Sequence, residues 1–181
     1  MLTDLLQRKF TRYFNVLDYD HNGVIEQEDF EDVALKLAQV RHWAPGSPGH
    51  QACQAGMMSI WQHLQQFADT SNNGRISLKA WLQTEEDAIA TEENYVKYVT
   101  PVAAALFDLV DENGDGVIGV QEYRNFFAGY RIAPDLADDA FARMDVDGDG
   151  QLSKEALLQH VHDFHCSDDP AAPGNWLLGP F

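Results

Sequence analysis

The sequence predicts an all-α protein made of four helix–loop–helix repeats. The first observation is a loop pattern that occurs four times: Asp at position 1, small polar residues at positions 3 and 5, Gly at 6 and an aliphatic residue at 8. The second is that apolar residues flank the loops at nearly fixed offsets. The twelve-residue loops span 18–29, 69–80, 111–122 and 145–156. Such self-similarity indicates one structural unit used repeatedly along the chain.

The segments on either side of each loop have the periodicity of amphipathic helices. The first entering helix carries an apolar stripe made of Leu2, Leu5, Leu6, Phe10, Phe14 and Leu17. An apolar residue also follows position 12 of every loop, namely Phe30, Trp81, Tyr123 and Leu157. Ser77 and Ser153 occupy position 9 of their loops, where a serine side chain can cap the helix that follows. Each loop is therefore expected to lie between an entering and an exiting helix.

Proline and glycine mark the divisions between repeats. The segment 44–49 is expected to form the loop that ends the first exiting helix. Thr100 followed by Pro101 predicts an N-cap and helix start for the third repeat, and Pro134 predicts the start of the fourth. Residues 166–175 are rich in turn formers and precede an apolar peptide. The predicted units are an N-terminal pair of repeats (1–90), a C-terminal pair (91–165) and a tail (166–181).

The aliphatic residue at position 8 predicts how the loops pair. Loops of this kind are expected to join two by two through a short antiparallel β-ladder. We expect Ile25 to face Ile76 in the first pair, and Ile118 to face Leu152 in the second. The predicted fold class is thus all-α, with one short β-ladder between the loops of each pair.

Composition excludes several classes of partner. The 181-residue chain has 29 acidic and 12 basic residues, giving a formal net charge of −17. This charge repels nucleic acid and anionic membranes and attracts cations, so neither is an expected partner. Cys53 and Cys166 are too few for a disulfide framework and fit a reducing compartment. Because the N-terminal residues lack the apolar core of a signal peptide, we expect a cytoplasmic protein, and a monomer.

The loop residues suit Ca²⁺, a hard cation that takes about six to eight oxygen ligands. Side chains at positions 1, 3 and 5, a backbone carbonyl at 7 and a bidentate carboxylate at 12 supply them, and Gly at 6 permits the bend. The third loop has the complete set, namely Asp111, Asn113, Asp115, the Val117 carbonyl and Glu122. The sequence predicts calcium binding most strongly for this loop.

The first loop is complete except that its last ligand is one methylene shorter. Its expected ligands are Asp18, Asp20, Asn22, the Val24 carbonyl and Asp29. Either Asp29 binds through one oxygen and gives a smaller, six-fold shell, or the exiting helix moves inward. Mg²⁺ prefers six-fold coordination, so it is an expected competitor at this loop.

The other two loops are incomplete. The fourth loop offers Asp145, Asp147, Asp149 and the Gln151 carbonyl. Its position 12 is Ala156, which removes two oxygens from the shell, so we expect weakened calcium binding there. The second loop has one carboxylate, Asp69, with Ala80 at position 12 and a positive charge from Arg75. We expect no ion in the second loop, which is retained as the pairing partner of the first.

With its loops placed, the chain resembles the EF-hand sarcoplasmic calcium-binding proteins and their prokaryotic relative calerythrin. The resemblance covers almost the full length. It rests on the four-repeat layout, the weak second loop, the segment 162–165 (HDFH) and the closing segment 174–181 (GNWLLGPF). In that family the two EF-hand pairs pack into one compact globule, and the C-terminal tail folds into the core. The resemblance implies a calcium buffer or carrier, and Ala156 is the departure from the family pattern.

Two alternatives to a buffer stay open. One is a calcium sensor that exposes a groove for a protein partner, although the chain has only four Met residues for such a groove. The other is a coelenterazine-type ligand binder or photoprotein, which the segment 105–111 resembles. Those proteins line a cavity with His, Trp and Tyr, and the counterparts here would be Trp43, Trp61, Trp81, Trp176 and His162 or His165.

No enzyme is expected from this sequence. The acidic clusters are not accompanied by a glycine-rich phosphate loop or a paired lysine. His162 and His165 can share a helix face, which is the one hint of a transition-metal site. We expect both instead to be surface residues that interact with the C-terminal end of the helix dipole.

Overall fold

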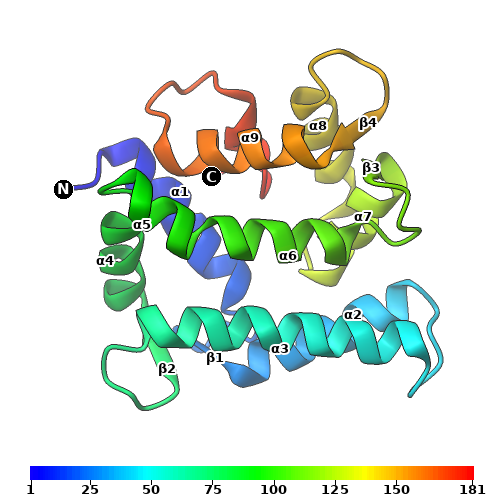
Figure 1. Cartoon of the computed structure of the whole chain (residues 1–181), viewed down its shortest axis with the longest axis horizontal. Coiled ribbons are helices and arrows are strands. Elements are labelled where there is room, and N and C mark those ends of the chain that lie inside the picture. The colour runs from blue at the N-terminus through cyan, green and yellow to red at the C-terminus, as the bar shows by residue number, and fades with distance from the viewer.

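Each predicted repeat folds as an entering helix, a loop containing a three-residue strand, and an exiting helix (Figure 1). The computed structural model describes all residues from Met1 to Phe181. The N-terminal half contains α1 (Asp4–Leu17), β1 (Val24–Glu26), α2 (Gln27–Val40), α3 (Pro48–Ala68), β2 (Arg75–Ser77) and α4 (Leu78–Ala88). The C-terminal half contains α5 (Glu92–Tyr98), α6 (Thr100–Val110), β3 (Val117–Gly119), α7 (Val120–Gly129), α8 (Pro134–Met144), β4 (Gln151–Ser153), α9 (Lys154–Cys166) and the short 3₁₀ helix η1 (Pro173–Trp176).

The loops pair in the predicted register. β1 is antiparallel to β2 with Ile25 opposite Ile76, and β3 is antiparallel to β4 with Ile118 opposite Leu152. All four of these side chains are buried. The pairing prediction is therefore confirmed, and each ladder fixes two loops side by side at one end of a repeat pair.

Helix boundaries follow the predicted caps with two exceptions. Ser77 and Ser153 accept hydrogen bonds from the backbone N–H groups three residues on, and Pro134 opens α8, as predicted. The segment 44–49 is only partly loop, because α3 already starts at Pro48. Thr100 does not cap α6: it is the first residue of that helix, and the cap position is Val99. The reason is the short helix α5, which runs almost directly into α6 and was not predicted.

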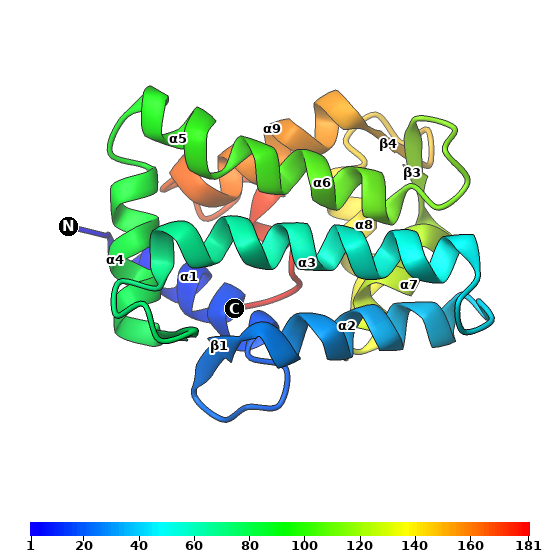
Figure 2. The same ribbon diagram turned by 60° about the horizontal axis from the view of Figure 1, so that its bottom comes forward.

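The two pairs of repeats share one core. A single cluster of 41 buried residues draws on helices from both halves of the chain. The halves meet where α2 packs on α7, where α3 packs on α6 and where α1 packs on α9, and Figure 2 shows α2, α3 and α6 stacked side by side. The predicted fold class is confirmed: the chain is mostly helical, with two small antiparallel ladders in one globule.

The C-terminal tail is tied to the first helix of the chain. Lys9 is fully buried, and its ammonium donates hydrogen bonds to the carbonyls of Asp163 and Ser167 and to the Asn175 side chain. Burial lowers the pKa of Lys9 to about 8. One turn further along α1, Arg12 donates to the Leu178 carbonyl, so the C-terminal segment is held at two successive turns of α1. Figure 2 shows the C-terminal end of the chain beside α1. None of the helices combines the length and the apolar character needed to cross a bilayer.

Candidate metal centres

The first loop gathers three carboxylates at the junction of α1 and α2. Oxygen atoms of Asp18, Asp20 and Asp29 all lie within 4.8 Å of one another. Asp18 stands directly after the last residue of α1, and Asp29 lies in the first turn of α2. Asp18 and Asp29 are buried, whereas Asp20 is exposed. The end of α1 thus places Asp18, and the start of α2 places Asp29, close to Asp20 in the loop between them.

Asp29 spans the loop despite its short side chain. One carboxylate oxygen accepts a hydrogen bond from the Tyr19 N–H at 2.8 Å, and the other accepts one from the Glu26 N–H at 2.8 Å. Burial raises the pKa of Asp29, and these backbone hydrogen bonds partly oppose the rise. Since α2 starts at Gln27, position 10 of its loop, as the exiting helices of the other three loops do, the two alternatives for Asp29 stay open.

The bend of each loop is held in the same way in all four repeats. The first aspartate accepts a hydrogen bond from the N–H of the glycine at position 6. The distances are 3.0 Å for Asp18 and Gly23, 2.7 Å for Asp69 and Gly74, 3.0 Å for Asp111 and Gly116, and 2.9 Å for Asp145 and Gly150. Gly23 has a φ of 88° and Gly116 a φ of 87°, which glycine adopts without the steric cost that a Cβ would bring.

The third loop has the predicted ligand types, but its three acids are less tightly gathered. Glu122 lies in the first turn of α7. One Glu122 oxygen accepts a hydrogen bond from the Glu112 N–H at 2.9 Å, and the other accepts one from the Gly119 N–H at 2.9 Å. Asp111 and Asp115 accept backbone N–H groups within the loop. Glu122 thus connects the two ends of the loop in the same manner as Asp29 does in the first.

The fourth loop gathers three carboxylates without a partner at position 12. Oxygen atoms of Asp145, Asp147 and Asp149 lie within 4.8 Å of one another, and the latter two residues are exposed. Ala156 donates its N–H to the Ser153 hydroxyl, so the start of α9 is held by a serine cap rather than by an acid. No acid from the exiting helix reaches back to the start of this loop.

The second loop keeps the backbone of the others but not their charge. Asp69 accepts the N–H groups of Asn73 and Gly74, and Asn73 accepts the N–H of Arg75. No cluster of three acids forms here, as its composition predicts. The loop has the bend of a metal-binding loop with only one carboxylate in it.

Comparison with known proteins identifies this loop architecture. The EF hand family model matches residues 11–34, 103–127 and 136–157, which contain the first, third and fourth loops. The chain therefore contains EF hands. Calerythrin from Saccharopolyspora erythraea is 27% identical to it over 165 residues, covering 90% of this chain and 91% of the relative. The resemblance to calerythrin and the sarcoplasmic calcium-binding proteins is confirmed, and the names of these relatives agree with a binding protein rather than an enzyme.

Solved structures show the same fold over the whole EF-hand chain. A sarcoplasmic calcium-binding protein from amphioxus superimposes with a TM-score of 0.76 at 22% identity, covering 100% of both chains. Coelenterazine-binding protein from Renilla muelleri, in its calcium-loaded apo form, superimposes with a TM-score of 0.73 at 23% identity, covering 99% of this chain and 100% of that one. At these identities the likeness concerns the fold alone.

The structure adds two charged contacts to the EF-hand loops that sequence reasoning missed. Arg75 of the second loop stands opposite Glu26 in the first ladder, and their side chains form an ion pair at 3.2 Å. The Glu26 side chain also accepts a hydrogen bond from the Asn22 amide at 2.7 Å. The ladder register, once predicted, places position 7 of one loop opposite position 9 of the other, so this ion pair could have been found from the sequence.

The second contact joins the two halves of this EF-hand protein. Arg41, just after α2, packs against the third loop, with its guanidinium 3.3 Å from the Glu112 carboxylate and 3.5 Å from the Val110 carbonyl. The guanidinium also stacks on Trp43, 5.0 Å from the ring centre. Nothing in the local sequence signals this contact, because it depends on how the two halves pack, with α2 on α7 and α3 on α6.

The prediction of two surface histidines was wrong for His165 and correct for His162, which is exposed. His165 is buried among aromatic side chains, and burial lowers its pKa to about 4. His162 instead packs against Tyr95, so the two rings do not form a metal site. The helical periodicity of α9 predicts which of its residues lie on the same face. It does not predict that residues of α1, α4 and α5 cover the face that carries His165.

Proposed function

We propose that this protein binds calcium through its first, third and fourth loops and acts as a calcium buffer. The observation that carries the proposal is the first loop, where Asp18, Asp20 and Asp29 converge within 4.8 Å. Crowded carboxylates repel one another unless a cation lies among them, and carboxylate and carbonyl oxygens are the ligands that calcium prefers. The names of calerythrin and of the sarcoplasmic calcium-binding proteins support the choice of ion.

The three loops are proposed to differ in strength. In the third loop, Asp111, Asn113, Asp115, the Val117 carbonyl and Glu122 supply the ion with a full set of oxygens. In the first loop, Asp18, Asp20, Asn22, the Val24 carbonyl and Asp29 do so with one shorter acid, which leaves Mg²⁺ as a competitor. In the fourth loop, Asp145, Asp147, Asp149 and the Gln151 carbonyl act without an acid at position 12. The second loop takes no ion and serves as partner to the first.

A buffer is favoured over a sensor by the way the tail is held. A sensor must expose an apolar groove when calcium binds. Here Leu177 and Leu178 are buried, and the tail carbonyls accept hydrogen bonds from Arg12 and from the Tyr123 hydroxyl. The space that a target helix would occupy is therefore filled by the chain itself. Two free cysteines, Cys53 and Cys166, fit the reducing cytoplasm in which such a buffer acts.

A coelenterazine-type role has less support. The protein has an apolar cavity between α3, α4, α6, α9 and the C-terminal tail. None of the four tryptophans lines it, and of the two candidate histidines only His165 does. Trp81 is buried elsewhere, with its indole N–H donating to the Phe10 carbonyl at 3.0 Å.

Calorimetric titration with calcium, in the presence and absence of millimolar magnesium, tests the proposed sites. We expect three binding events, the weakest of which is lost in Asp145→Asn and the strongest in Glu122→Gln. Magnesium should weaken mainly the event lost in Asp18→Asn. Asp69→Asn, in the second loop, is the matched control and should leave the number of events unchanged. Absence of binding heat, or an effect of Asp69→Asn equal to the others, would overturn the assignment.

A dye that fluoresces on apolar surfaces separates buffer from sensor. We expect little change in its fluorescence when calcium is added to the chelated protein below its melting temperature. A large rise on calcium binding would show a newly exposed apolar groove, and the sensor function would then replace the buffer.

A further inference from the structure

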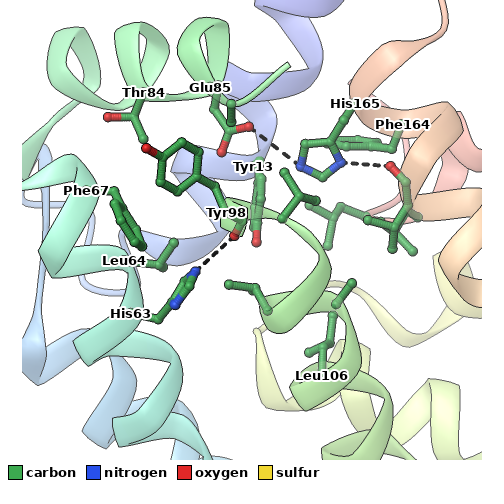
Figure 3. A pocket seen from close by; sticks show the side chains of 17 residues that line it. Tyr13, His63, Leu64, Phe67, Thr84, Glu85, Tyr98, Leu106, Phe164 and His165 are labelled. Carbon is green, nitrogen blue, oxygen red and sulfur yellow. Dashed lines mark hydrogen bonds and ion pairs between the residues drawn. The ribbon is translucent and has the colours of Figure 1, made fainter. Parts of the chain in front are cut away.

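An apolar cavity lies between α3, α4, α6, α9 and the C-terminal tail, away from all four loops (Figure 3). Its volume is about 50 Å³, and thirteen of its seventeen lining residues are hydrophobic. One water needs ~10–15 Å³ of such space, so the cavity exceeds what a single water fills. Tyr13, Phe164 and Leu106 form part of its wall, and the half-buried Phe67 and Tyr98 lie toward the surface (Figure 3).

Two polar side chains lie next to one another in the wall of this cavity. Glu85 of α4 and His165 of α9 are both buried, with 3.6 Å between the Glu85 Oε2 and the His165 Nε2 (Figure 3). That separation is too long for a hydrogen bond. Glu85 Oε2 has no hydrogen-bond partner at all, which is rare for a buried polar atom and unfavourable.

The protonation of the pair follows from its surroundings. Burial raises the pKa of Glu85 to about 8 and lowers the pKa of His165 to about 4, so both are neutral near pH 7. The other ring nitrogen, His165 Nδ1, donates its proton to the Val161 carbonyl at 2.7 Å. His165 Nε2 is therefore a free acceptor, and the protonated Glu85 carboxyl is a free donor.

We propose that this cavity binds a small neutral ligand with one hydroxyl group, such as a phenol, whose hydroxyl accepts from Glu85 and donates to His165 Nε2. A hydroxyl can do both at once, which matches an unpaired donor and an unpaired acceptor that are neighbours in the cavity wall. The aromatic and aliphatic walls receive the apolar part of the ligand.

Charged ligands of the same shape are excluded by the same residues. No lysine or arginine lines the cavity, so a carboxylate would be desolvated without a cation to pair with it. An ammonium would require Glu85 to ionise inside an apolar wall, against the direction in which burial shifts its pKa. The site selects a neutral hydroxyl.

Access to the cavity runs past side chains that are only half-buried. The His63 ring hydrogen-bonds to the Tyr98 carbonyl at 3.1 Å, and Phe67 packs edge-to-face on Tyr98, with ring centres 4.3 Å apart. The α5 helix, which ends at Tyr98, has no fully buried residue. A ligand that holds an aromatic ring must therefore displace Phe67 and Tyr98, the half-buried part of the wall.

Fluorine NMR on the full-length, calcium-loaded protein at pH 7 tests the proposal. Three probes of one shape are compared: 4-fluorophenol, 4-fluorobenzoate and 4-fluorobenzylamine. We expect line broadening and saturable binding for the phenol alone. Failure of the phenol to bind, or equal binding of the benzoate or the amine, would overturn the proposal.

Variants of Glu85 locate the probe. Glu85→Leu keeps the size of the side chain and removes the donor, so phenol affinity should fall about tenfold. Glu85→Gln keeps a donor and should bind within about threefold of the parent. Glu86→Leu, the next residue of α4, which faces a different surface hollow, is the matched control and should change nothing. Unchanged phenol binding in Glu85→Leu, or an equal loss in Glu86→Leu, would contradict the assigned contact. Melting curves establish that each variant is folded.

Discussion

The guanidinium of Arg41 lies 3.3 Å from the carboxylate of Glu112, and this contact joins the end of the first EF-hand to the start of the third loop. The Arg41 side chain is 1% exposed, whereas that of Glu112 is 28% exposed. The ion pair lacks hydrogen-bond geometry at the Arg41 Nε, so its contribution is electrostatic. The buried side of Arg41 is completed by the Trp43 ring and the Val110 carbonyl.

We predict that Arg41→Met lowers the free energy of unfolding by about 1–3 kcal/mol in calcium-free buffer, because the Val110 carbonyl loses its donor and Trp43 loses its cation. Urea unfolding measures the change. Glu112→Gln removes only the half-exposed partner and should cost less than about 1 kcal/mol. A larger loss in Glu112→Gln than in Arg41→Met would show that the ion pair, rather than the burial of Arg41, holds this junction.

Glu85 is predicted to make the free energy of unfolding fall as the pH rises. Its pKa is raised from 4.5 to about 8, so the folded state holds a proton that the unfolded state has released. The contribution of Glu85 to the free energy of unfolding is fully present below pH 4.5. It is lost as the pH rises to 8, at up to ~1.4 kcal/mol per pH unit. His165 acts the other way, because its stability is present above pH 6.5 and is lost as the pH falls toward 4.

Glu85 titrates in the window from pH 6.5 to 8, and the comparison with Glu85→Gln removes the contribution of Lys9, whose pKa of about 8 lies at the end of that window. Burial raises the pKa values of the neighbouring Tyr13 and Tyr95 well above this window, so neither titrates in it. We expect the parent to lose stability across the window relative to Glu85→Gln, as measured by urea unfolding at each pH. Parallel pH profiles for the two proteins would show that Glu85 is ionised at neutral pH.

The length of the acid at position 12 is predicted to set ion selectivity in the first and third loops. Asp29→Glu should strengthen calcium binding to the first loop roughly tenfold and reduce competition by magnesium, because a longer acid can offer both oxygens to the larger ion. Glu122→Asp in the third loop should have the opposite effect. Calcium titration in millimolar magnesium measures both. If magnesium competes equally with parent and variant at each loop, acid length does not control selectivity here.

The fourth loop is predicted to gain strength from a single acid. Ala156→Glu supplies the missing ligand next to three carboxylates that already lie within 4.8 Å of one another. Ala80→Glu, at the same position of the second loop, adds an acid where only Asp69 stands and Arg75 opposes. We expect a rise in calcium affinity of at least about tenfold for the first variant and little for the second. Equal gains by calorimetry would mean that the acids at positions 3 and 5 matter less than proposed.

Much of the fold could be predicted because its signals are local. The loop pattern, the serine caps at Ser77 and Ser153 and the aliphatic pairs such as Ile25 and Ile76 depend on residues a few positions apart or on one repeated unit. The missed cap at Thr100 is also local in origin: α5 is only seven residues long, too short for its periodicity to be distinguished from a loop.

What could not be predicted depends on how the repeats dock. The surroundings of His165 come from α1, α4 and α5, so its burial and its lowered pKa had no signal within α9. Likewise, Arg41 and Glu112 are 71 positions apart in the sequence and meet only because α2 and α6 belong to one core. The ligand residues of the loops stay a prediction, but the closeness of the acids in the first and fourth loops could be expected, since a twelve-residue loop brings them together.

A crystal structure of the protein grown in abundant calcium tests the central claim most directly. We expect an ion in the third loop bound by Asp111 and Glu122, and an ion in the first loop bound by Asp18 and Asp29. The second loop should contain none. Vacant first and third loops in such a crystal, with their acids turned toward solvent, would contradict the account.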